Sequence, residues 1–245
     1  MLNAQLIIPG EYETTLHYAA EHFITLCRNA IQDHGVFYVA LSGGSTPKAI
    51  YELLCQGENK EEIEWEKIHL FWSDERSVPP DHPDSNYKMA MEAGFADMDI
   101  PPTHIHRMVA EKEIEKNAHA YEKTIREILE GRTFDLIMLG MGEDGHTASL
   151  FPGTKALEAK GTVAPNFLPK ENTWRMTLTF NCINSSSHIV FYVMGVKKKE
   201  MLSRVFSSSP SLPCQKIGFI DKPALWIVDE AAGSFSFSLS SRAQK

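Results

Sequence analysis

Asp144 and His146 are the residues whose types and spacing most directly suggest chemistry. They lie in the segment GMGEDGHT, where Gly140, Gly142 and Gly145 follow a short apolar run. Glycines let the backbone fold closely around a small ligand. An imidazole can act as a general base near neutral pH, and a carboxylate two residues away can set its tautomer. The segment predicts a catalytic loop, although a tight turn with a surface histidine is the alternative on the loop alone.

A second glycine-rich segment, SGGSTP, supplies groups that suit a phosphate. Gly43 and Gly44 expose backbone amides, Ser45 and Thr46 carry hydroxyls, and a helix is expected from Pro47. A helix N-terminus presents N–H groups and a positive dipole end, which favour an anion. The segment matches neither the Walker pattern nor the dinucleotide pattern, so the evidence for a nucleotide is weak. An ordinary turn with Thr46 as the helix cap is the alternative.

Positive charges follow two other predicted strands. Arg76 lies in the segment SDER, where a guanidinium could bind phosphate oxygens or form a salt bridge with a neighbouring carboxylate. Lys197, Lys198 and Lys199 begin a predicted helix, where their charge opposes the helix dipole. An anion bound nearby would relieve this conflict, and solvated lysines are the alternative.

Other combinations of reactive residues are less informative. His104 and His106 alternate along a predicted strand and so face one side, as two zinc ligands would, but no third ligand is evident. The four cysteines form no CxxC pair, and no serine lies in a GxSxG segment. We therefore predict no metal site, free thiols in a reducing compartment, and no serine-hydrolase triad.

The composition is that of an ordinary globular protein with an acidic balance. Lys and Arg total 24 against 32 Asp and Glu, for a formal charge of −8 in 245 residues. This balance argues against a general nucleic-acid surface, so an anionic substrate would need a local basic pocket. No secretion signal or apolar run long enough for a bilayer is found. We expect one cytoplasmic domain over residues 1–245, with no nucleic-acid or membrane partner.

Apolar periodicity and turn residues predict strands that alternate with helices. The strands are expected at residues 5–8, 36–41, 68–72, 135–139, 175–180, 188–194 and 224–228. The helices are expected at residues 12–31, 47–55, 86–93, 112–129 and 196–206, with a short helix after the last strand. Residues 153–172 are rich in Pro and Gly and are predicted to be irregular, either a lid or a connection.

This alternation predicts a largely parallel, doubly wound α/β sheet with helices on both faces. Ligands of such sheets bind beyond the C-terminal ends of the strands. The segments SGGST, SDER and GEDGH and the turn at Gly195 all follow predicted strands. They should therefore lie together at one edge of the sheet.

Four segments together resemble the 6-phosphogluconolactonases: LSGGSTPKAIYELL, FWSDERSVPPDHPDSNY, DLIMLGMGEDGHTASLFPG and GVKK before a helix. The match runs through most of the chain in the right order. The resemblance implies a three-layer α/β fold shared with the glucosamine-6-phosphate isomerases, with a mostly parallel, Rossmann-like sheet. It also implies a cytosolic, cofactor-free enzyme of the pentose phosphate pathway, a monomer or weak homo-oligomer, that hydrolyses 6-phospho-D-glucono-1,5-lactone to 6-phosphogluconate.

The resemblance also assigns roles to residues. His146 would be the base that activates water, and Asp144 would support it. Asp74 matches a carboxylate that transfers protons in the isomerases, while in a lactonase it is also free to orient Arg76 or a substrate hydroxyl. The remaining matched residues would hold the phosphate: Gly43, Gly44, Ser45, Thr46, Arg76 and Lys198.

Two other functions stay open at this point. A glucosamine-6-phosphate isomerase (deaminase) resembles this chain, but its loop is similar to DGHIAFNEP, with a glutamate that helps set up the ring-opening histidine. Here Phe151 precedes Pro152 and cannot accept a proton, and Arg76 stands where the isomerases tend to have tyrosine. A non-catalytic sugar-phosphate sensor is the other alternative, and the presence of both Asp144 and His146 counts against it.

Overall fold

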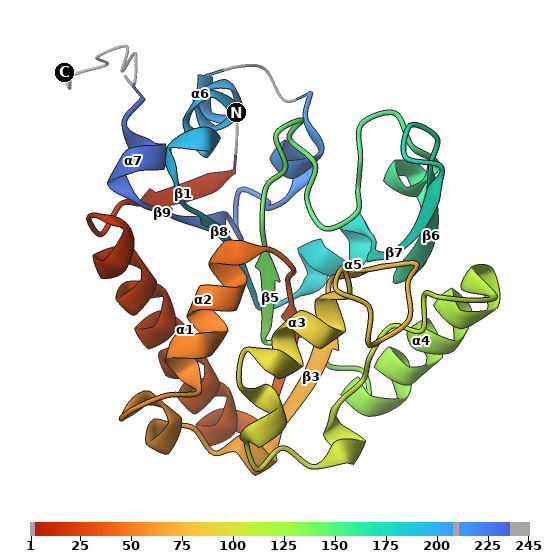
Figure 1. Ribbon diagram of the computed structural model, residues 1–245, viewed down its shortest axis with the longest axis horizontal. Coiled ribbons are helices and arrows are strands. Elements are labelled where there is room, and N and C mark those ends of the chain that lie inside the picture. Colours follow the sequence, from red (N-terminus) through yellow and green to blue (C-terminus); the bar gives the residue numbers. More distant parts are fainter. Residues whose placement is uncertain (1–2, 208–210, 236–245) are drawn as a thin grey trace.

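A computed structural model describes residues 3–207 and 211–235 (Figure 1). Residues 1–2, 208–210 and 236–245, which the single-domain prediction includes, lie outside this description. A six-stranded sheet runs through the molecule in the order β1-β9-β8-β5-β2-β3, and its neighbouring strands pair in parallel. Its strands are β1 (Ala4–Ile7), β2 (Phe37–Leu41), β3 (Ile68–Trp72), β5 (Leu136–Leu139), β8 (His188–Val193) and β9 (Ala224–Val228).

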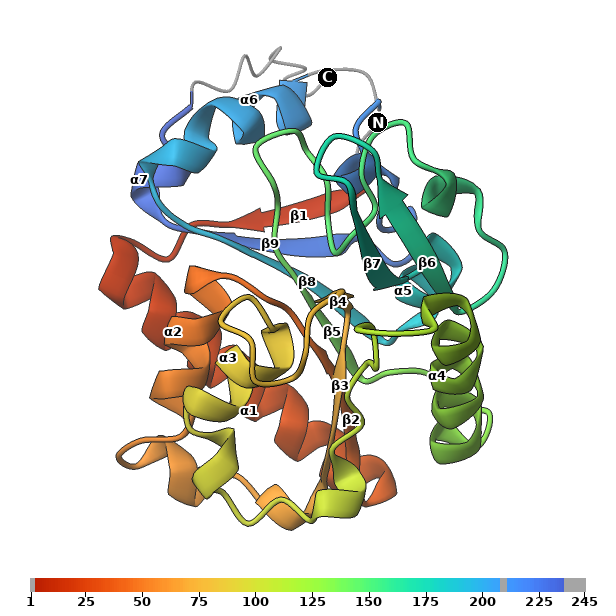
Figure 2. The ribbon, with the colours of Figure 1, turned by 45° about the vertical axis from the view of Figure 1, so that its right-hand side comes forward.

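Helices cover both faces of this sheet, which confirms the predicted α/β class. Figures 1 and 2 show α1 (Tyr12–His34) and α2 (Ser45–Leu54) together on one side and α4 (Ile114–Leu129) on the other. Every residue of β2 and β5 is buried, as expected for parallel strands between two layers. No helix within the described ranges is long and apolar enough to span a membrane. The other helices of the described ranges are α3 (Asn86–Glu92), α5 (Phe180–Ser185), α6 (Lys199–Ser207) and α7 (Glu230–Gly233).

A second, antiparallel sheet was not predicted. It contains three strands in the order β4-β7-β6, namely β4 (Asp74–Arg76), β7 (Thr173–Leu178) and β6 (Val163–Leu168), and it packs against α4. The prediction that residues 153–172 are irregular is therefore wrong for β6. Pro165 concealed this strand, because proline is tolerated within a sheet chiefly on an edge strand, which β6 is.

Ser73 joins the two sheets. Its N–H donates to the carbonyl of Leu41 in the large sheet at 2.7 Å, and its carbonyl accepts from the N–H of Leu178 in the small sheet at 2.8 Å. The chain thus leaves β3 and enters β4 at the C-terminal edge of the large sheet. The SDER segment is held between the sheets as a consequence.

Two local predictions were wrong. The helix α2 begins at Ser45, with Gly44 as its N-cap at φ +108°, so Thr46 lies in the first turn and does not cap it. Glycine adopts this left-handed conformation at little cost, which lets the helix begin two residues earlier than Pro47. The predicted strand through His104 and His106 is a short 3₁₀ turn, Pro102–His104, followed by an isolated bridge to β3.

Candidate active site

The polar segments that follow the strands meet in one pocket of about 420 Å³. This confirms the expectation that they share one edge of the sheet. Asp144 does not line the pocket itself but lies against His146. The lining includes the other residues that the sequence singled out: Gly43, Gly44, Ser45, Thr46, Asp74, Arg76, His146 and Lys198.

Asp144 and His146 form a hydrogen-bonded pair on the loop after β5. The carboxylate Oδ1 accepts from the backbone N–H of His146 at 3.0 Å and lies 2.5 Å from its ring Nδ1. Burial alone would raise the pKa of Asp144, but the hydrogen bonds and positive charge of His146 outweigh it and lower the pKa. Because Nδ1 is held by the carboxylate, Nε2 is the ring nitrogen left for chemistry.

The His146 ring is positioned by its two neighbours, Phe151 and Gly142. The ring of Phe151 stacks on the imidazole with centroids 3.9 Å apart and planes 23° apart. A Cβ atom at Gly142 would lie 2.1 Å from two atoms of the same imidazole. Of the residue types, only glycine at position 142 leaves room for this orientation of the His146 ring.

Asp74 is a buried carboxylate in the wall of the pocket, with only 7% of its surface exposed. Its Oδ2 accepts from the hydroxyl of Ser149 at 2.6 Å, and its Oδ1 lies 3.3 Å from the Asn86 side-chain amide. A Cβ atom at Gly43 would lie 2.0 Å from the Asn86 side chain. The glycine loop, β4 and α3 are therefore packed together around Asp74. Neither Asn86 nor Ser149 was identified from the sequence.

Glu75, the middle residue of β4, organises the SDER segment. Its carboxylate accepts from the backbone N–H groups of Arg76, Asn86 and Tyr87 and from the hydroxyl of Ser85. Burial raises the pKa of Glu75, and these backbone hydrogen bonds offset part of the increase. The carboxylate ties the start of α3 to β4 and leaves the Arg76 side chain free of it.

Arginine side chains line the β4–β7 side of the pocket. Arg76 donates from Nη1 to the carbonyl of Asp84 at 2.7 Å, and no carboxylate of the described ranges lies within 4 Å of its nitrogens. The alternative of a salt bridge within SDER is therefore not observed. Arg175 on β7 also lines the pocket. It was missed, because nothing in a predicted strand signals which side chains face a pocket.

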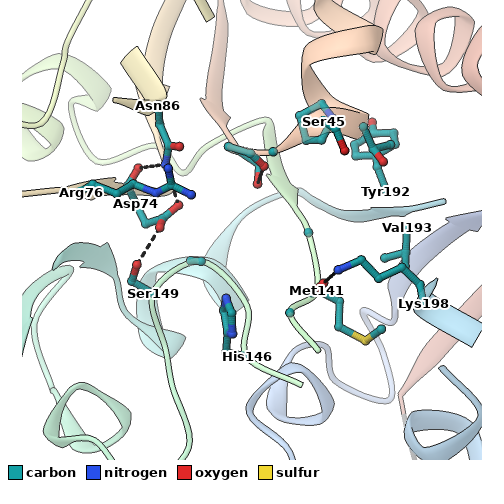
Figure 3. A pocket seen from close by; sticks show the side chains of 18 of the residues that line it. Ser45, Asp74, Arg76, Asn86, Met141, His146, Ser149, Tyr192, Val193 and Lys198 are labelled. Carbon is teal, nitrogen blue, oxygen red and sulfur yellow. Dashed lines mark hydrogen bonds between the residues drawn. The ribbon is translucent and has the colours of Figure 1, made fainter. Parts of the chain in front are cut away.

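Lys198 provides the positive charge on the opposite side. It is half-buried and donates from Nζ to the carbonyl of Met141 at 2.6 Å, whereas Lys197 and Lys199 are exposed. Figure 3 shows Lys198 and Arg76 on opposite sides of the pocket, with His146 on the loop between them. The buried Asp229 accepts from the N–H of Gly195 and so fixes the turn that carries Lys198.

The glycine loop is held to α2 by a buried tyrosine. Tyr51 accepts from the N–H of Ser42 at 3.0 Å and donates to the carbonyl of the same residue at 2.9 Å. The loop therefore enters α2 in a fixed orientation. The first turn of the helix lines the pocket with Ser45 and Thr46, which carry hydroxyl groups.

Comparison with known proteins identifies the family. The family described as glucosamine-6-phosphate isomerases/6-phosphogluconolactonase matches residues 11–226. The chain belongs to this family. It is 40% identical over 229 residues to a 6-phosphogluconolactonase of Chlamydia pneumoniae, covering 91% of this chain and 87% of that protein. It is 38% identical over 219 residues to one of Nostoc, covering 86% and 89%.

Solved structures agree with this family membership. A 6-phosphogluconolactonase of Trypanosoma cruzi superposes with a TM-score of 0.82 at 28% identity, over 98% of each chain. One of Thermotoga maritima gives 0.79 at 31% identity, over 92% of this chain and 98% of that chain. A monomeric glucosamine-6-phosphate deaminase gives 0.78 at 19% identity, over 96% of this chain and all of that chain, and shares the fold.

Proposed function

We propose that this protein hydrolyses 6-phospho-D-glucono-1,5-lactone to 6-phosphogluconate in the pentose phosphate pathway. The observation that carries the proposal is the Asp144–His146 pair, whose free ring nitrogen belongs to a pocket with positive charge on both sides. Lactone hydrolysis needs an oriented water, a base and donors for the developing oxyanion. The names of the relatives in Chlamydia and Nostoc support the same substrate. We include a cytoplasmic location and a cofactor-free reaction in this proposal.

His146 supplies both proton transfers of the proposed reaction. Asp144 holds the proton on Nδ1, so the lone pair on Nε2 can accept a proton from water as its oxygen bonds to C1. The tetrahedral intermediate then collapses with cleavage of the bond between C1 and the ring oxygen. The Nε2 proton passes to that oxygen, which becomes the C5 hydroxyl, and C1 becomes a carboxylic acid that releases its proton to solvent to give the carboxylate.

The phosphate of the substrate is assigned to the side of the pocket with α2 and Lys198. The first turn of α2 offers amides near the positive end of its dipole, and Ser45 and Thr46 add hydroxyls. Lys198 is the lysine of its triplet that lines the pocket. Arg76 lines the pocket across from these groups, and we propose that its guanidinium binds the phosphate from that side.

Phe151 favours the lactonase over the isomerase (deaminase). The ring packs on His146 at the position where the isomerase-like segment carries a glutamate, and an aromatic ring can neither accept nor donate a proton in its place. Asp74 is held by Ser149 and Asn86, and we propose that it binds a substrate hydroxyl. Proton transfer between His146 and a carboxylate at position 151 is therefore impossible in this protein.

The direct test is a coupled assay on freshly made lactone, corrected for spontaneous hydrolysis. We expect acceleration by the purified protein, retention of activity with a strong chelator, and no deamination of glucosamine 6-phosphate. Robust deaminase turnover, or loss of lactonase activity on chelation that zinc restores, would overturn the proposal. Binding of the lactone without turnover would instead favour the sensor.

The lysine triplet gives a matched test of the phosphate assignment. Lys198→Ala should raise KM for the lactone by roughly tenfold or more, because a charge-assisted contact is removed. Lys197→Ala and Lys199→Ala remove the same charge from exposed positions and should change KM little. A larger effect of either neighbour would show that the phosphate lies elsewhere.

A further inference from the structure

The peptide group between Gly145 and His146 is held by hydrogen bonds at both of its ends. The N–H of His146 donates to Asp144 Oδ1 at 3.0 Å, and the carbonyl of Gly145 accepts from the N–H of Cys214 at 3.1 Å. The same Asp144 oxygen lies 2.5 Å from the His146 ring, so a rotation of this peptide group would change how the carboxylate meets the imidazole. Cys214 therefore belongs to a segment that controls the geometry of the catalytic pair.

A buried leucine of the same segment packs on this turn. A Cβ atom at Gly145 would lie 3.0 Å from the Leu212 side chain, so this side chain lies directly against the glycine backbone. Gly145 has φ +79°, a left-handed conformation that glycine adopts at little cost. Leu212 is 8% exposed and Cys214 is fully buried. Residues 211–215, which we call the clamp, thus hold the turn by a hydrogen bond and by close packing.

Gln215 shapes the clamp and joins it to α6. Its Oε1 accepts from the N–H groups of Ser211 and Leu212 at 2.8 and 2.9 Å. Its Nε2 donates to the carbonyl of Val205 on α6 at 2.8 Å. Only 5% of Gln215 is exposed, so water competes little for these hydrogen bonds. One side chain therefore determines where Leu212 lies against the catalytic turn.

The helix that anchors the clamp also follows the lysine of the pocket. α6 begins at Lys199, directly after the 3₁₀ turn Val196–Lys198. Lys198 donates to the carbonyl of Met141, near the start of the loop that carries the catalytic pair. The loop is thus connected to this part of the chain at two points, by Lys198 at its start and by Gln215 and the clamp at its turn.

We propose that Gln215 is a positioning residue for the reaction, and that it acts through the clamp on the peptide group between Gly145 and His146. This inference rests on the proposed function and adds a residue that acts on the base rather than on the substrate. A displacement of a reacting group by about 1 Å is enough to slow catalysis strongly. Loss of the Gln215 acceptor should therefore lower kcat and leave KM for the lactone nearly unchanged.

Two substitutions at this position separate positioning from stability. Gln215→Met keeps the length of the side chain and removes both hydrogen-bonding groups, so it should lower kcat by roughly tenfold. Gln215→Glu keeps an oxygen that accepts from the clamp but loses the donor to Val205 and buries a carboxylate. It should lower the melting temperature at least as much as Gln215→Met and yet recover most of kcat. A residue with a structural role alone would leave kcat of the folded protein at the wild-type level in both variants.

Thr179→Val is the matched control. Thr179 is fully buried, and its hydroxyl also accepts from an N–H at the start of a helix, that of Cys182, and donates to the carbonyl of Gly161 in a separate segment. Removal of this hydroxyl should lower the melting temperature and leave kcat unchanged. A fall in kcat as large as that of Gln215→Met would show that any loss of buried hydrogen bonds slows the enzyme, which overturns the inference.

The ring nitrogens of His146 give a second measurement that needs no turnover. Their NMR chemical shifts report the hydrogen bond between Nδ1 and Asp144, and His146→Ala identifies the signals. We expect changed shifts in Gln215→Met, or in Leu212→Ala if the former fails to fold, and unchanged shifts in Thr179→Val. With an active wild-type protein, an unchanged kcat or unchanged shifts in these clamp variants would overturn the inference. If the wild-type protein does not hydrolyse the lactone but the shifts change as expected, the proposed function fails and the positioning of the histidine stands.

Discussion

Histidines in two regions of this molecule have contrasting environments. His146 lies on a loop at the pocket and pairs with a carboxylate, with Nδ1 2.5 Å from Asp144 Oδ1. At the outer edge of β3, His69 stacks on His104 with ring centroids 3.8 Å apart, and its Nδ1 lies 3.1 Å from Nε2 of His106. None of these three rings forms an ion pair within the described part of the chain.

The difference shows that the groups around a histidine ring determine whether the ring can take part in proton transfer. Burial, together with the charges of neighbouring histidines, lowers the pKa of His69 and of His106 to about 4 each. These rings stay neutral at pH 7 and contribute packing. At His146 the Asp144 carboxylate instead holds one ring nitrogen, so the other nitrogen is oriented to accept a proton during a reaction. Among the residues described, no group of histidines, cysteines or carboxylates is arranged to hold a metal ion.

The largest effect should come from removing the pocket histidine. His146→Ala should lower kcat for the lactone by roughly a hundredfold or more while substrate affinity changes little, because a general base acts mainly in the transition state. The wild-type rate should fall in acid as the base becomes protonated, and that acidic limb should vanish in the variant. Steady-state kinetics across pH measure both. A near-normal kcat with an unchanged pH profile would make Asp74 the leading candidate for the base.

A smaller loss is expected when the histidine stays but its ring is displaced. A methyl group at Gly142 would overlap the His146 ring, with a distance of 2.1 Å to its nearest atoms. Gly142→Ala should therefore lower kcat by roughly ten- to a hundredfold through misplacement of the base. Gly140→Ala is the control, since the nearest atom to its added Cβ is the Ser42 hydroxyl at 3.9 Å. Equal losses in the two variants would show that ring position is unimportant.

The carboxylate partner should matter less than the ring itself. Asp144→Asn keeps the shape of the side chain but removes its charge, and half of the Asp144 side chain is exposed to solvent. We expect kcat to fall by roughly tenfold, because the neutral amide gives less support to the positive charge that develops on the ring in the transition state.

Steady-state kinetics of Asp144→Asn measure this loss. A fall in kcat with little change in KM supports a pair that acts in the transition state. An unchanged kcat would mean that Asp144 merely shapes the loop.

Much of the fold was predictable because local signals agreed with one another. The apolar runs of β2 and β5 end at glycines, and α2 follows directly from the glycine loop, so strand, loop and helix are each marked in the sequence. The small sheet was missed for a physical reason. β6 contains Pro165 and the buried polar Asn166, and both interrupt the apolar alternation by which a strand is predicted.

In the candidate site, too, some features could be predicted from the sequence and others could not. The predicted loops meet because parallel strands place their C-terminal ends at one edge, which follows from topology. The position of Arg76 opposite Arg175 depends on the register of β4 with β7, and no local pattern reports that these two distant strands pair. Likewise, the contact between Gly43 and Asn86 depends on packing of separate elements. Long-range pairing is therefore the part that single-sequence reasoning leaves open.

The smallest expected effect concerns the histidines at the sheet edge and is one of stability. An unfolded histidine has a pKa of about 6.5, whereas His69 and His106 have values lowered to about 4 in the folded protein. Between these values the unfolded chain binds more protons. The contribution of the two rings to the free energy of unfolding is therefore complete above about pH 6.5 and is lost as the pH falls toward 4.

The test compares one substitution at two positions. His106→Gln removes a half-buried ring, and His119→Gln removes an exposed ring on α4. Urea unfolding at pH 7 and pH 5 should show a loss of unfolding free energy of about 1–2 kcal/mol in the wild-type protein from the two rings, discounted because both are partly exposed. This acid loss should be clearly smaller in His106→Gln and unchanged in His119→Gln. If His106→Gln loses as much free energy between pH 7 and pH 5 as the wild-type protein, the cluster does not sense protons, and its contrast with His146 fails.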